Sequence, residues 1–422
     1  MESLNTAKRS EKVVVVGGGI IGIACAHYLN EAGFQVTVID QGEIGQGCSY
    51  ANCGFICPSD VLPLTEPGAV MTGLKSLFDP DAAFRIKPQL RLSLYQWLLQ
   101  FARRCNKRQM IWAGRQLHTL FESSVSEYQR LFEEDNFDVE WKQKGLLYVL
   151  QSEQGLKTFR HTEQLLADNY GLQAHEIAGE QLQSFDPAFK QGLAGAFWYQ
   201  QDSSLRSDKL ILSWRQQLEG KGVCFKEHCR LERIGKSAET ITYLETSQGN
   251  IFADHYVVAA GAWSSKLAHQ LDCKIPVEPG KGYSLTMSKP ENCPNYPMLF
   301  PEHRIGVTPF DESYRIASMM EFSGYNTEIP PRRIDQLKRS AEPYLLTPHG
   351  ETIQETWYGW RPMTWDSLPI IGRVPGLSNA VLATGHNMLG LSLAPVTGKL
   401  ISEIIQEGDS HIALDAFSPS RF

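Results

Sequence analysis

The stretch from residue 13 to residue 40 constrains the fold of this chain more than any other. Four consecutive valines, Val13 to Val16, predict a strand buried on both faces, because a parallel strand covered by helices needs no polar alternation. The glycines that follow, Gly17, Gly19 and Gly22, form the pattern GxGxxG. The first permits a tight turn, the second lets the backbone approach a pyrophosphate, and the third lets a helix pack on the strand.

A helix and a second strand complete this unit. The helix is expected to run through Ile21 and Leu29 and to end at Gly33, with its amide hydrogens directed at bound phosphates. Phe34 to Ile39 predicts a hydrophobic strand that ends on Asp40, whose carboxylate can accept hydrogen bonds from a ribose 2′-hydroxyl. A glycine-rich turn of any α/β protein would match GxGxxG alone. The order of strand, glycines, helix, strand and acid favours a dinucleotide, and the acid makes NADP the least expected one.

Length and composition limit the class of protein. A chain of 422 residues predicts two domains, and a net charge of −7 without a long basic run predicts no nucleic-acid partner. Nine cysteines without a CxxC pair favour reduced thiols in a cytoplasmic protein over a disulfide framework. The polar residues 1–12 predict a short disordered lead-in rather than a signal peptide. No apolar run is long enough to span a bilayer.

A glycine-rich loop follows Asp40, and its small residues would let a flat ring system lie close to the backbone. The loop also contains Cys48, Cys53 and Cys57. Their spacings match no common zinc or iron–sulfur pattern, and no histidine accompanies them. We therefore predict no metal site and expect these cysteines to be packing residues.

An amphipathic helical pattern covers residues from about Pro88 to Gly114 and ends in a basic cluster that includes Arg103 and Arg108. Such a helix could lie on an anionic membrane or pack on its own domain as an ordinary surface helix. The width of the apolar stripe favours ordinary packing. A second helix is expected from about Leu117 to Glu133.

Further elements follow from periodicity and from turn residues. Strands are expected at 146–150, 222–234, 256–260 (ending at Gly261) and 380–384, hairpins at 241–263 and 305–325, and helices at 153–170, 207–220, 334–344 and 391–406. Asp202, Ser203, Ser204 and Asp208 predict a capping turn at the start of the helix at 207. Pro276 to Pro279 predicts a linker that precedes an antiparallel region.

Seven motifs occur in order along nearly the whole chain: GxGxxG, SYANCGFICP, VVAAGAW, KGYSLT, GWRPMTWDSLPIIGR, TGHNMLGLSLAP and FSPSRF. With these motifs the chain resembles the DadA-type D-amino-acid dehydrogenases of the glycine oxidase and D-amino-acid oxidase group of flavoproteins. The resemblance implies an α/β, Rossmann-like FAD-binding domain formed by residues 12–82, 202–274 and 352–422. It also implies an inserted α+β substrate-binding domain of antiparallel sheet and helices, formed by residues 83–201 and 275–351.

The resemblance implies positions for FAD as well. They are Gly17, Gly19, Ile21 and Gly22 at the pyrophosphate, Asp40 and Gln41 at the adenosine ribose, Ser49, Ala51, Asn52 and Gly54 along the isoalloxazine and ribityl chain, Leu231, Gly261 and Trp263 on the adenine side, and His386, Asn387, Met388 and Leu389 at the pyrimidine end. Sarcosine oxidase relatives attach flavin through a cysteine where this chain has Gly359. Non-covalent FAD is therefore expected.

Arg361 is the main catalytic candidate, because it matches the arginine that grips the amino-acid carboxylate in this group. Tyr283 is a weaker candidate for the other side of the pocket. His386 is interpreted as a positional residue, because hydride transfer from a carbon that bears a neutral amine needs no base. Glycine oxidases carry an arginine where this chain has Met388, so the two pockets are expected to differ.

The resemblance implies oxidation of a D-amino acid, or of a cyclic amino acid such as hydroxyproline, to the imino or keto acid by hydride transfer to flavin N5. Alternatives are a glycine/sarcosine-type oxidase that uses oxygen, an FAD-holding subunit of a larger electron-transfer complex, and an NAD-dependent dehydrogenase. The expected partners are a small amino acid and a quinone or other electron acceptor. A cytoplasmic location is expected, and peripheral contact with the inner face of the membrane stays open.

Overall fold

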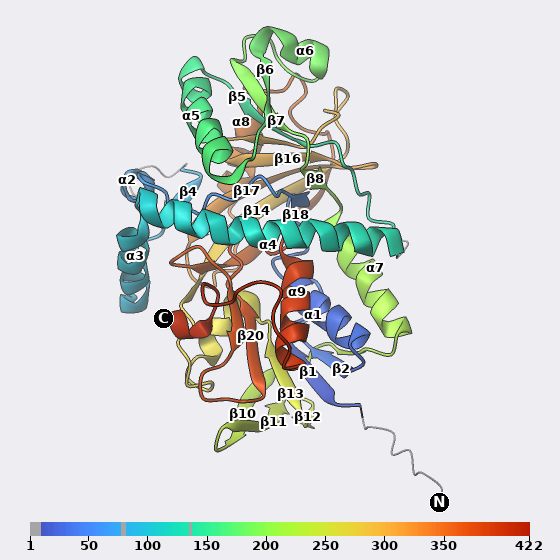
Figure 1. Ribbon diagram of the computed structural model, residues 1–422. Coiled ribbons are helices and arrows are strands. Elements are labelled where there is room, and N and C mark those ends of the chain that lie inside the picture. The colour runs from blue at the N-terminus through green and yellow to red at the C-terminus, as the bar shows by residue number, and fades with distance from the viewer. Residues whose placement is uncertain (1–9, 77–81, 135–136) are drawn as a thin grey trace, which may run out of the picture.

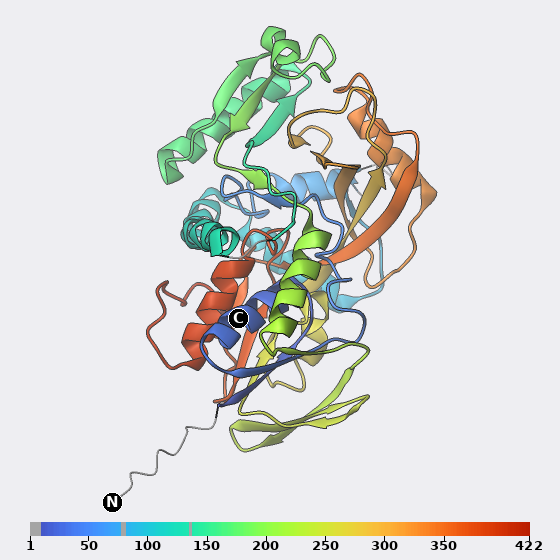
Figure 2. The ribbon, with the colours of Figure 1, turned by 90° about the vertical axis from the view of Figure 1, so that its right-hand side faces the viewer.

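The computed structural model describes residues 10–76, 82–134 and 137–422, so the predicted lead-in at 1–12 lies almost entirely outside the described residues. Two large sheets lie one above the other along the long axis of the molecule, and the long helix α4 (Lys107–Glu134) crosses between them (Figures 1 and 2).

The lower sheet has six strands in the order β19-β20-β13-β1-β2-β9. Their bounds are β1 Lys12–Val16, β2 Gln35–Ile39, β9 Cys224–Lys226, β13 His255–Val258, β19 Ile370–Arg373 and β20 Ala380–Thr384. All neighbours pair in parallel except β19 and β20. The valines of β1 are buried at the centre of the sheet, as predicted.

The glycine motif joins β1 to α1 (Ile20–Glu31) with very close backbone approaches. Gly17 has a φ of +112°, and a Cβ there would lie 2.4 Å from the carbonyl oxygen of Ala259. A Cβ on Gly22 would lie 1.8 Å from the carbonyl oxygen of Gly17. The structure thus confirms the tight turn and the close helix–strand packing.

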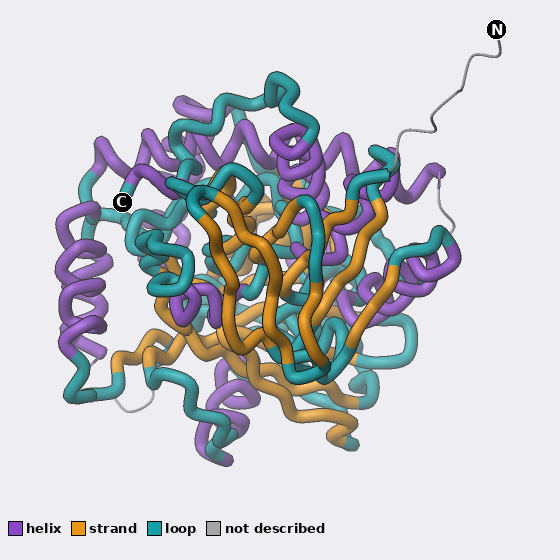
Figure 3. Tube along the Cα trace, turned by 90° about the horizontal axis from the view of Figure 1, so that it is seen from below, coloured by secondary structure: helices purple, strands orange, loops and turns teal. Residues whose placement is uncertain are grey.

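Helices surround the lower sheet, as the view from below shows (Figure 3). α9 (Ala394–Ile405) packs against α1, where a Cβ on Gly398 would lie 2.5 Å from the carbonyl oxygen of Ala24. α7 (Ser207–Gly220) also contacts α1.

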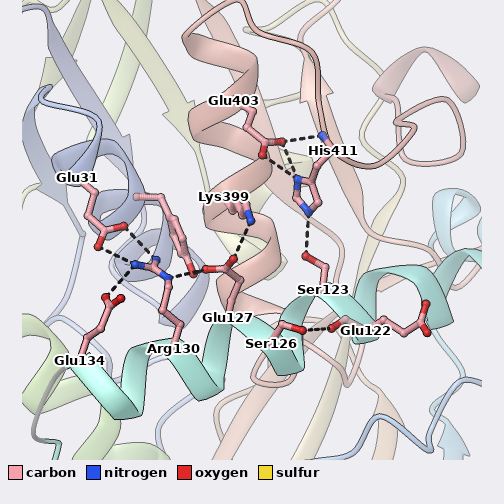
Figure 4. A network of polar contacts seen from close by, with 11 residues as sticks. Glu31, Glu122, Ser123, Ser126, Glu127, Arg130, Glu134, Lys399, Glu403 and His411 are labelled. Atoms are coloured by element: carbon pink, nitrogen blue, oxygen red, sulfur yellow. Dashed lines mark hydrogen bonds and ion pairs between the residues drawn. The ribbon is translucent and has the colours of Figure 1, made fainter.

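A polar network fastens α4 to this layer (Figure 4). Arg130 on α4 forms ion pairs with Glu31, Glu127 and Glu134, and Glu127 pairs with Lys399 of α9 at 2.7 Å. Further along α4 and α9, His411 bridges Ser123 and Glu403 through hydrogen bonds of 2.8 Å.

The upper sheet has nine strands, ordered β18-β14-β17-β16-β15-β5-β7-β6, with β4 also paired to β17. Their bounds are β4 Phe84–Ile86, β5 Leu146–Leu150, β6 His175–Ala178, β7 Gly195–Tyr199, β14 Val277–Met287, β15 Met298–Phe300, β16 Ile305–Pro309, β17 Tyr314–Phe322 and β18 Ile353–Thr364. β14 is buried at every residue because sheet neighbours flank it and other elements cover it.

The remaining elements complete the periphery. They are α2 Ala69–Ser76, α3 Leu92–Arg104, α5 Glu153–Tyr170, α6 Leu182–Phe185, α8 Pro331–Ala341, the two-stranded β3 Phe55–Ile56 with β8 Ser203–Ser204, the three-stranded β10 Leu231–Ser237, β11 Thr240–Thr246 and β12 Gly249–Ile251, and the 3₁₀ turns η1 Gly179–Gln181, η2 Gly261–Leu267 and η3 Pro419–Arg421.

Several elements coincide with their predicted bounds, namely the strands at 146–150 and 380–384 and the helices at 153–170 and 207–220. The predicted capping turn of α7 is wrong. The N-cap residue is Arg206, whose side chain makes no capping hydrogen bond. Ser203 and Ser204 form β8, and Asp208 forms an ion pair with Arg206.

Other predicted bounds are wrong. The helix expected from Pro88 to Gly114 breaks at Cys105, because the side chain of Asn106 accepts a hydrogen bond from the amide of Gln109 and starts α4. The strand expected at 222–234 is two strands in different sheets, separated by a turn with His228 at φ 54°.

The expected linker at 276–279 is also wrong, because Val277 already pairs with Thr364 in the upper sheet. α8 begins at Pro331, and α9 begins at Ala394 after a turn that the prediction had included in the helix. By sheet membership, β18 belongs with the upper sheet, although its residues fall in the third segment predicted for the FAD-binding domain.

Candidate active site

A cavity of about 610 Å³ lies where the carboxyl ends of the lower strands meet the upper sheet. From below it is lined by the ends of β1, β2, β13 and β20, and from above by residues of β14, β17 and β18. The carboxyl ends of parallel strands are the usual ligand site of such sheets.

The first end of the cavity is the glycine turn. Gly19, the N-cap residue of α1, makes no capping side-chain bond and the first turn has no acid, so the positive end of α1 faces the cavity, where the amide of Ile20 is bonded to the Ser49 hydroxyl. Asp40 accepts hydrogen bonds from the amides of Gly18 (2.7 Å) and Gly42 (2.9 Å), which fixes its carboxylate at the cavity. Its contact with a ribose stays a prediction.

The loop after Asp40 is held in place from the upper sheet. Arg315, almost fully buried, donates to the carbonyl of Asn52 at 2.9 Å, and Thr308 donates to the carbonyl of Cys53 at 2.6 Å. Ser49 accepts a hydrogen bond from the amide of Ile20 at 3.3 Å and so joins the loop to α1. These bonds fix the loop from both sheets.

Arg361, which is half-buried, brings a positive charge to the second end of the cavity. Its guanidinium lies over Gly282, where a Cβ would be 2.4 to 2.6 Å from three of its atoms. Burial lowers the pKa of Arg361, and the nearest groups that oppose this effect are the thiols of Cys48 and Cys53. No carboxylate of the described residues forms an ion pair with it. A half-buried cation that faces a cavity and has no counter-ion among the described residues can bind an anionic ligand.

A bulge in β17 orients this arginine. Ser318 and Met319 have φ values of 146° and 62°, and the pairing of β14 with β17 slips at this point. The displaced carbonyl of Met319 accepts a hydrogen bond from Arg361 Nη1 at 2.5 Å. Such strained backbone in non-glycine residues is concentrated at functional sites.

Tyr283 and Arg361 both line the cavity but belong to opposite faces of the upper sheet. Tyr283 lines the cavity, but in the register of β14 it pairs with Tyr358, whereas its neighbour Gly282 is the residue covered by Arg361. Successive side chains of a strand point to opposite faces. The Tyr283 ring packs in the upper core, 5.2 Å from Lys281 Nζ, and Tyr283 and Arg361 line the same cavity, so a role for Tyr283 in the substrate pocket stays a prediction.

His386 lies at the start of the last turn and is almost fully buried. Burial lowers its pKa to about 3, so the ring is neutral at ordinary pH, and its Nε2 is 2.9 Å from the hydroxyl of Thr397. Asn387 accepts a hydrogen bond from the amide of Thr364 at 2.9 Å and thereby joins this turn to β18. These contacts agree with a positional rather than a basic role for His386.

Most of the predicted site residues line this one cavity. They are Gly17, Gly19, Ile21, Asp40, Gln41, Ser49, Ala51, Asn52, Leu231, Gly261, Trp263, Tyr283, Arg361, His386, Asn387 and Met388. Gly22, Gly54 and Leu389 are not among its lining residues. Gly22 and Gly54 contact backbone carbonyls of Gly17 and Leu205, and Leu389 packs against the lower core.

Sequence analysis missed other lining residues, chiefly Trp357, Trp360, Lys266 and Cys48. Alternation along β18 is a signal that could have found Trp357, because residues 357, 359 and 361 share a face. Lys266 has no comparable signal, since it follows VVAAGAW in a 3₁₀ turn whose direction depends on tertiary packing.

Within residues 10–76, 82–134 and 137–422, no group of three or more potential ligands could hold a metal ion. No helix in this part of the chain is long and apolar enough to cross a membrane.

The cavity begins at a GxGxxG turn and continues to a second sheet. This arrangement is typical of redox proteins that bind a dinucleotide. The chain belongs to the family described as FAD dependent oxidoreductase (DAO), whose model matches residues 12–404.

Curated relatives match over almost the whole length. The chain is 29% identical to a D-amino acid dehydrogenase of Neisseria gonorrhoeae, over 97% of this chain and 99% of the relative. It is 31% identical to a D-amino acid dehydrogenase of Vibrio vulnificus, over 96% and 99%.

Solved structures share the fold. A glycine oxidase from Geobacillus kaustophilus superposes with a TM-score of 0.79 at 19% identity, covering 98% of this chain and 100% of that one. An L-proline dehydrogenase from P. horikoshii gives 0.71 at 21% identity, covering 98% of each chain.

The cavity fits FAD on its own geometry. Gly19 leaves space, since a Cβ there would have only the Ser49 hydroxyl nearby, at 3.7 Å, and the open end of α1 faces the same point. FAD is the cofactor of this family, and it would lie along the glycine turn, the loop at 49–52 and the turn at 386–388.

Proposed function

We propose that this protein oxidises a D-amino acid, or a cyclic amino acid such as hydroxyproline, to the corresponding imino acid with non-covalent FAD. The observation that carries the proposal is Arg361, a half-buried guanidinium in the cavity that has no carboxylate partner among the described residues. The similarity to proteins named D-amino acid dehydrogenase supports the choice of substrate.

Arg361 and His386 have different roles in this proposal. Arg361 holds the substrate carboxylate by two parallel hydrogen bonds, and Gly282 with the Met319 carbonyl fixes the guanidinium in that orientation. When bound, FAD would supply the two-electron acceptor for oxidation at the α-carbon. Burial lowers the pKa of His386 to about 3, which makes it a weak base, and its hydrogen bond with Thr397 gives it a positional role in the turn.

The decisive experiment is anaerobic mixing of the purified holoprotein with D-, L- and cyclic amino acids while the flavin absorbance near 450 nm is followed. Bleaching by D- or cyclic amino acids supports the proposal, and bleaching by none of them overturns it. Repeating turnover with a dye and with oxygen separates a quinone-type acceptor from an oxidase.

An oxygen-dependent glycine/sarcosine-type oxidase is the second candidate, favoured by the similarity to solved glycine oxidases. Glycine and sarcosine belong in the same panel, and rapid turnover of them in air would favour this candidate. Turnover by the isolated chain would exclude a role as an FAD-holding subunit that needs partners.

We also propose that α2 and α3 contact an anionic membrane. α3 buries Leu94 and Trp97, but Leu92 (73% exposed) and Leu99 (53%) face outward, and Met71 of α2 is 57% exposed. Both helices lie on the same side of the molecule (Figure 1). Exposed Arg103 lies in the last turn of α3, and exposed Lys107 and Arg108 follow the helix. Exposed apolar side chains beside basic ones fit an anionic lipid surface.

Vesicle flotation tests this contact. Binding is expected to vesicles that contain phosphatidylglycerol and to be weaker with pure phosphatidylcholine, and the double variant Leu92→Glu/Leu99→Glu should abolish it. Leu212→Glu, an equally exposed leucine on α7, is the matched control. Equal flotation of all three proteins would contradict the proposal.

A further inference from the structure

A flat apolar surface lies beside Arg361 in the cavity. Gly282 on β14 and Gly359 on β18 are directly opposite each other in the antiparallel register. Arg361 covers the first glycine, and Trp357 covers the second, because a Cβ on Gly359 would lie 2.3 and 2.6 Å from two carbons of its indole. Opposed Cβ positions are about 5 Å apart. The guanidinium and the indole therefore lie side by side on one face of the sheet.

Two neutral thiols lie beside this pair. Cys48 and Cys53 line the same part of the cavity, and burial raises the pKa of each thiol to about 11, so both are neutral. Ala317 on β17 shares the face, because it pairs with Ser284, the residue opposite Trp357. Among these described residues, Arg361 alone is charged.

We propose that Trp357 determines side-chain selectivity: its indole is the apolar surface against which the side chain of a carboxylate-anchored substrate packs. This inference rests on the proposed amino-acid oxidation. With the carboxylate on Arg361, the α-carbon is one bond further out, and the side chain begins within reach of an indole about 5 Å from the guanidinium. The favoured substrates are neutral amino acids with apolar side chains. Charged side chains would lose hydration here without an opposite charge in return.

A series of simple carboxylates tests this inference without turnover. Acetate, propanoate, butanoate and pentanoate are titrated into the oxidised holoprotein, and Kd is read from the flavin difference spectrum. Each added methylene is expected to lower Kd about fourfold in the wild type, the value for full burial of one methylene. Trp357→Ala should reduce this to less than about twofold. Tyr358→Phe, on the opposite face of the same strand, should keep the wild-type dependence.

Turnover provides the second measurement. The ratio of kcat/KM for D-leucine over D-alanine is expected to fall about tenfold or more in Trp357→Ala and to be largely retained in Trp357→Phe. A wild-type dependence on chain length in Trp357→Ala overturns the inference, as does loss of affinity for acetate and pentanoate by the same factor. If Trp357→Ala does not retain flavin, the same measurements are made on Trp357→Phe and Trp357→Leu. A D-leucine to D-alanine ratio that is unchanged in both variants also overturns the inference. Failure of the proposed function is distinct, since the wild-type flavin would then not be reduced by any amino acid.

Discussion

At the scale of single residues, the site depends on Gly282 as well as on Arg361. Arg361→Ala is expected to raise the substrate KM about 100-fold while FAD stays bound, because two charge-assisted hydrogen bonds are lost. Gly282→Ala should have a similar but smaller effect, since its Cβ would displace the guanidinium from the position that it occupies.

Steady-state kinetics and the flavin spectrum check this prediction together. Ser284→Ala is the control, because Ser284 lies two residues along β14, on the same face, and its buried hydroxyl has no hydrogen-bond partner. An unchanged KM in both Arg361→Ala and Gly282→Ala would remove Arg361 from the role of carboxylate ligand.

A second residue-scale prediction concerns pH. Asp202 is fully buried, accepts two hydrogen bonds from Ser59, and has a pKa raised by burial from 3.8 to about 8. Between these two values the folded protein keeps a proton that the unfolded chain has released, so a rising pH lowers the free energy of unfolding. Asp202→Asn removes this dependence. Its thermal midpoint should exceed that of the wild type at pH 8, and the gain should shrink toward pH 4.

Thermal unfolding at pH 4, 6 and 8 measures the effect, with the exposed Asp168→Asn as control. A difference between Asp202→Asn and wild type that is independent of pH would show that the carboxyl titrates alike in both states.

At the scale of elements, the sequence predicted correctly those helices and strands whose bounds are set by interactions within the segment itself. The strand Leu146–Leu150 and the helix Glu153–Tyr170 coincide with prediction, because hydrophobic periodicity, a capping Ser152 and a left-handed Gly171 all act within the segment. The linker expected at 276–279 failed for the opposite reason. Its prolines suggested a break, but pairing with β18 along the whole of β14 overrides that preference.

The same distinction applies to the site. The glycine turn and Asp40 are one local unit and were found from sequence. Trp357 was missed, although it lies four residues before Arg361, because its importance depends on the register of β14 with β18. The motif that contains Tyr283 likewise gives no information on which face of β14 its side chain occupies.

Arg130 gives the element-scale prediction. It joins α4 to α1 through Glu31 and lies beside Glu127, which also binds Lys399 (Figure 4). Arg130→Met should lower the free energy of unfolding by about 1 kcal/mol, a modest value because the guanidinium is one-third exposed and solvent screens its ion pairs. Thermal unfolding measures this, with Arg160→Met as control because its pair with Glu176 lies at the surface. Equal midpoints for the two variants would contradict a role of the network in holding α4.

At the scale of the whole molecule, the cavity is built from segments far apart in the sequence. Its walls come from residues near 17, 50, 230, 261, 282, 360 and 386, contributed by both sheets. A ligand that spans the cavity therefore stabilises both sheets together, by RT ln(1 + [L]/Kd) when it binds only the folded state.

The final prediction follows from this arrangement. The thermal midpoint of the apoprotein should rise with FAD concentration, and at 100 times Kd the stabilisation should be about 2.7 kcal/mol. ADP should stabilise less, because it reaches the glycine turn and Asp40 but neither the loop at 49–52 nor the turn at 386–388. ADP with an added 2′-phosphate should stabilise least, since that phosphate would meet the Asp40 carboxylate. At equal ligand concentration, stabilisation by ADP equal to that by FAD would show that FAD binding does not engage the upper sheet. The cavity would then not be one continuous cofactor and substrate site.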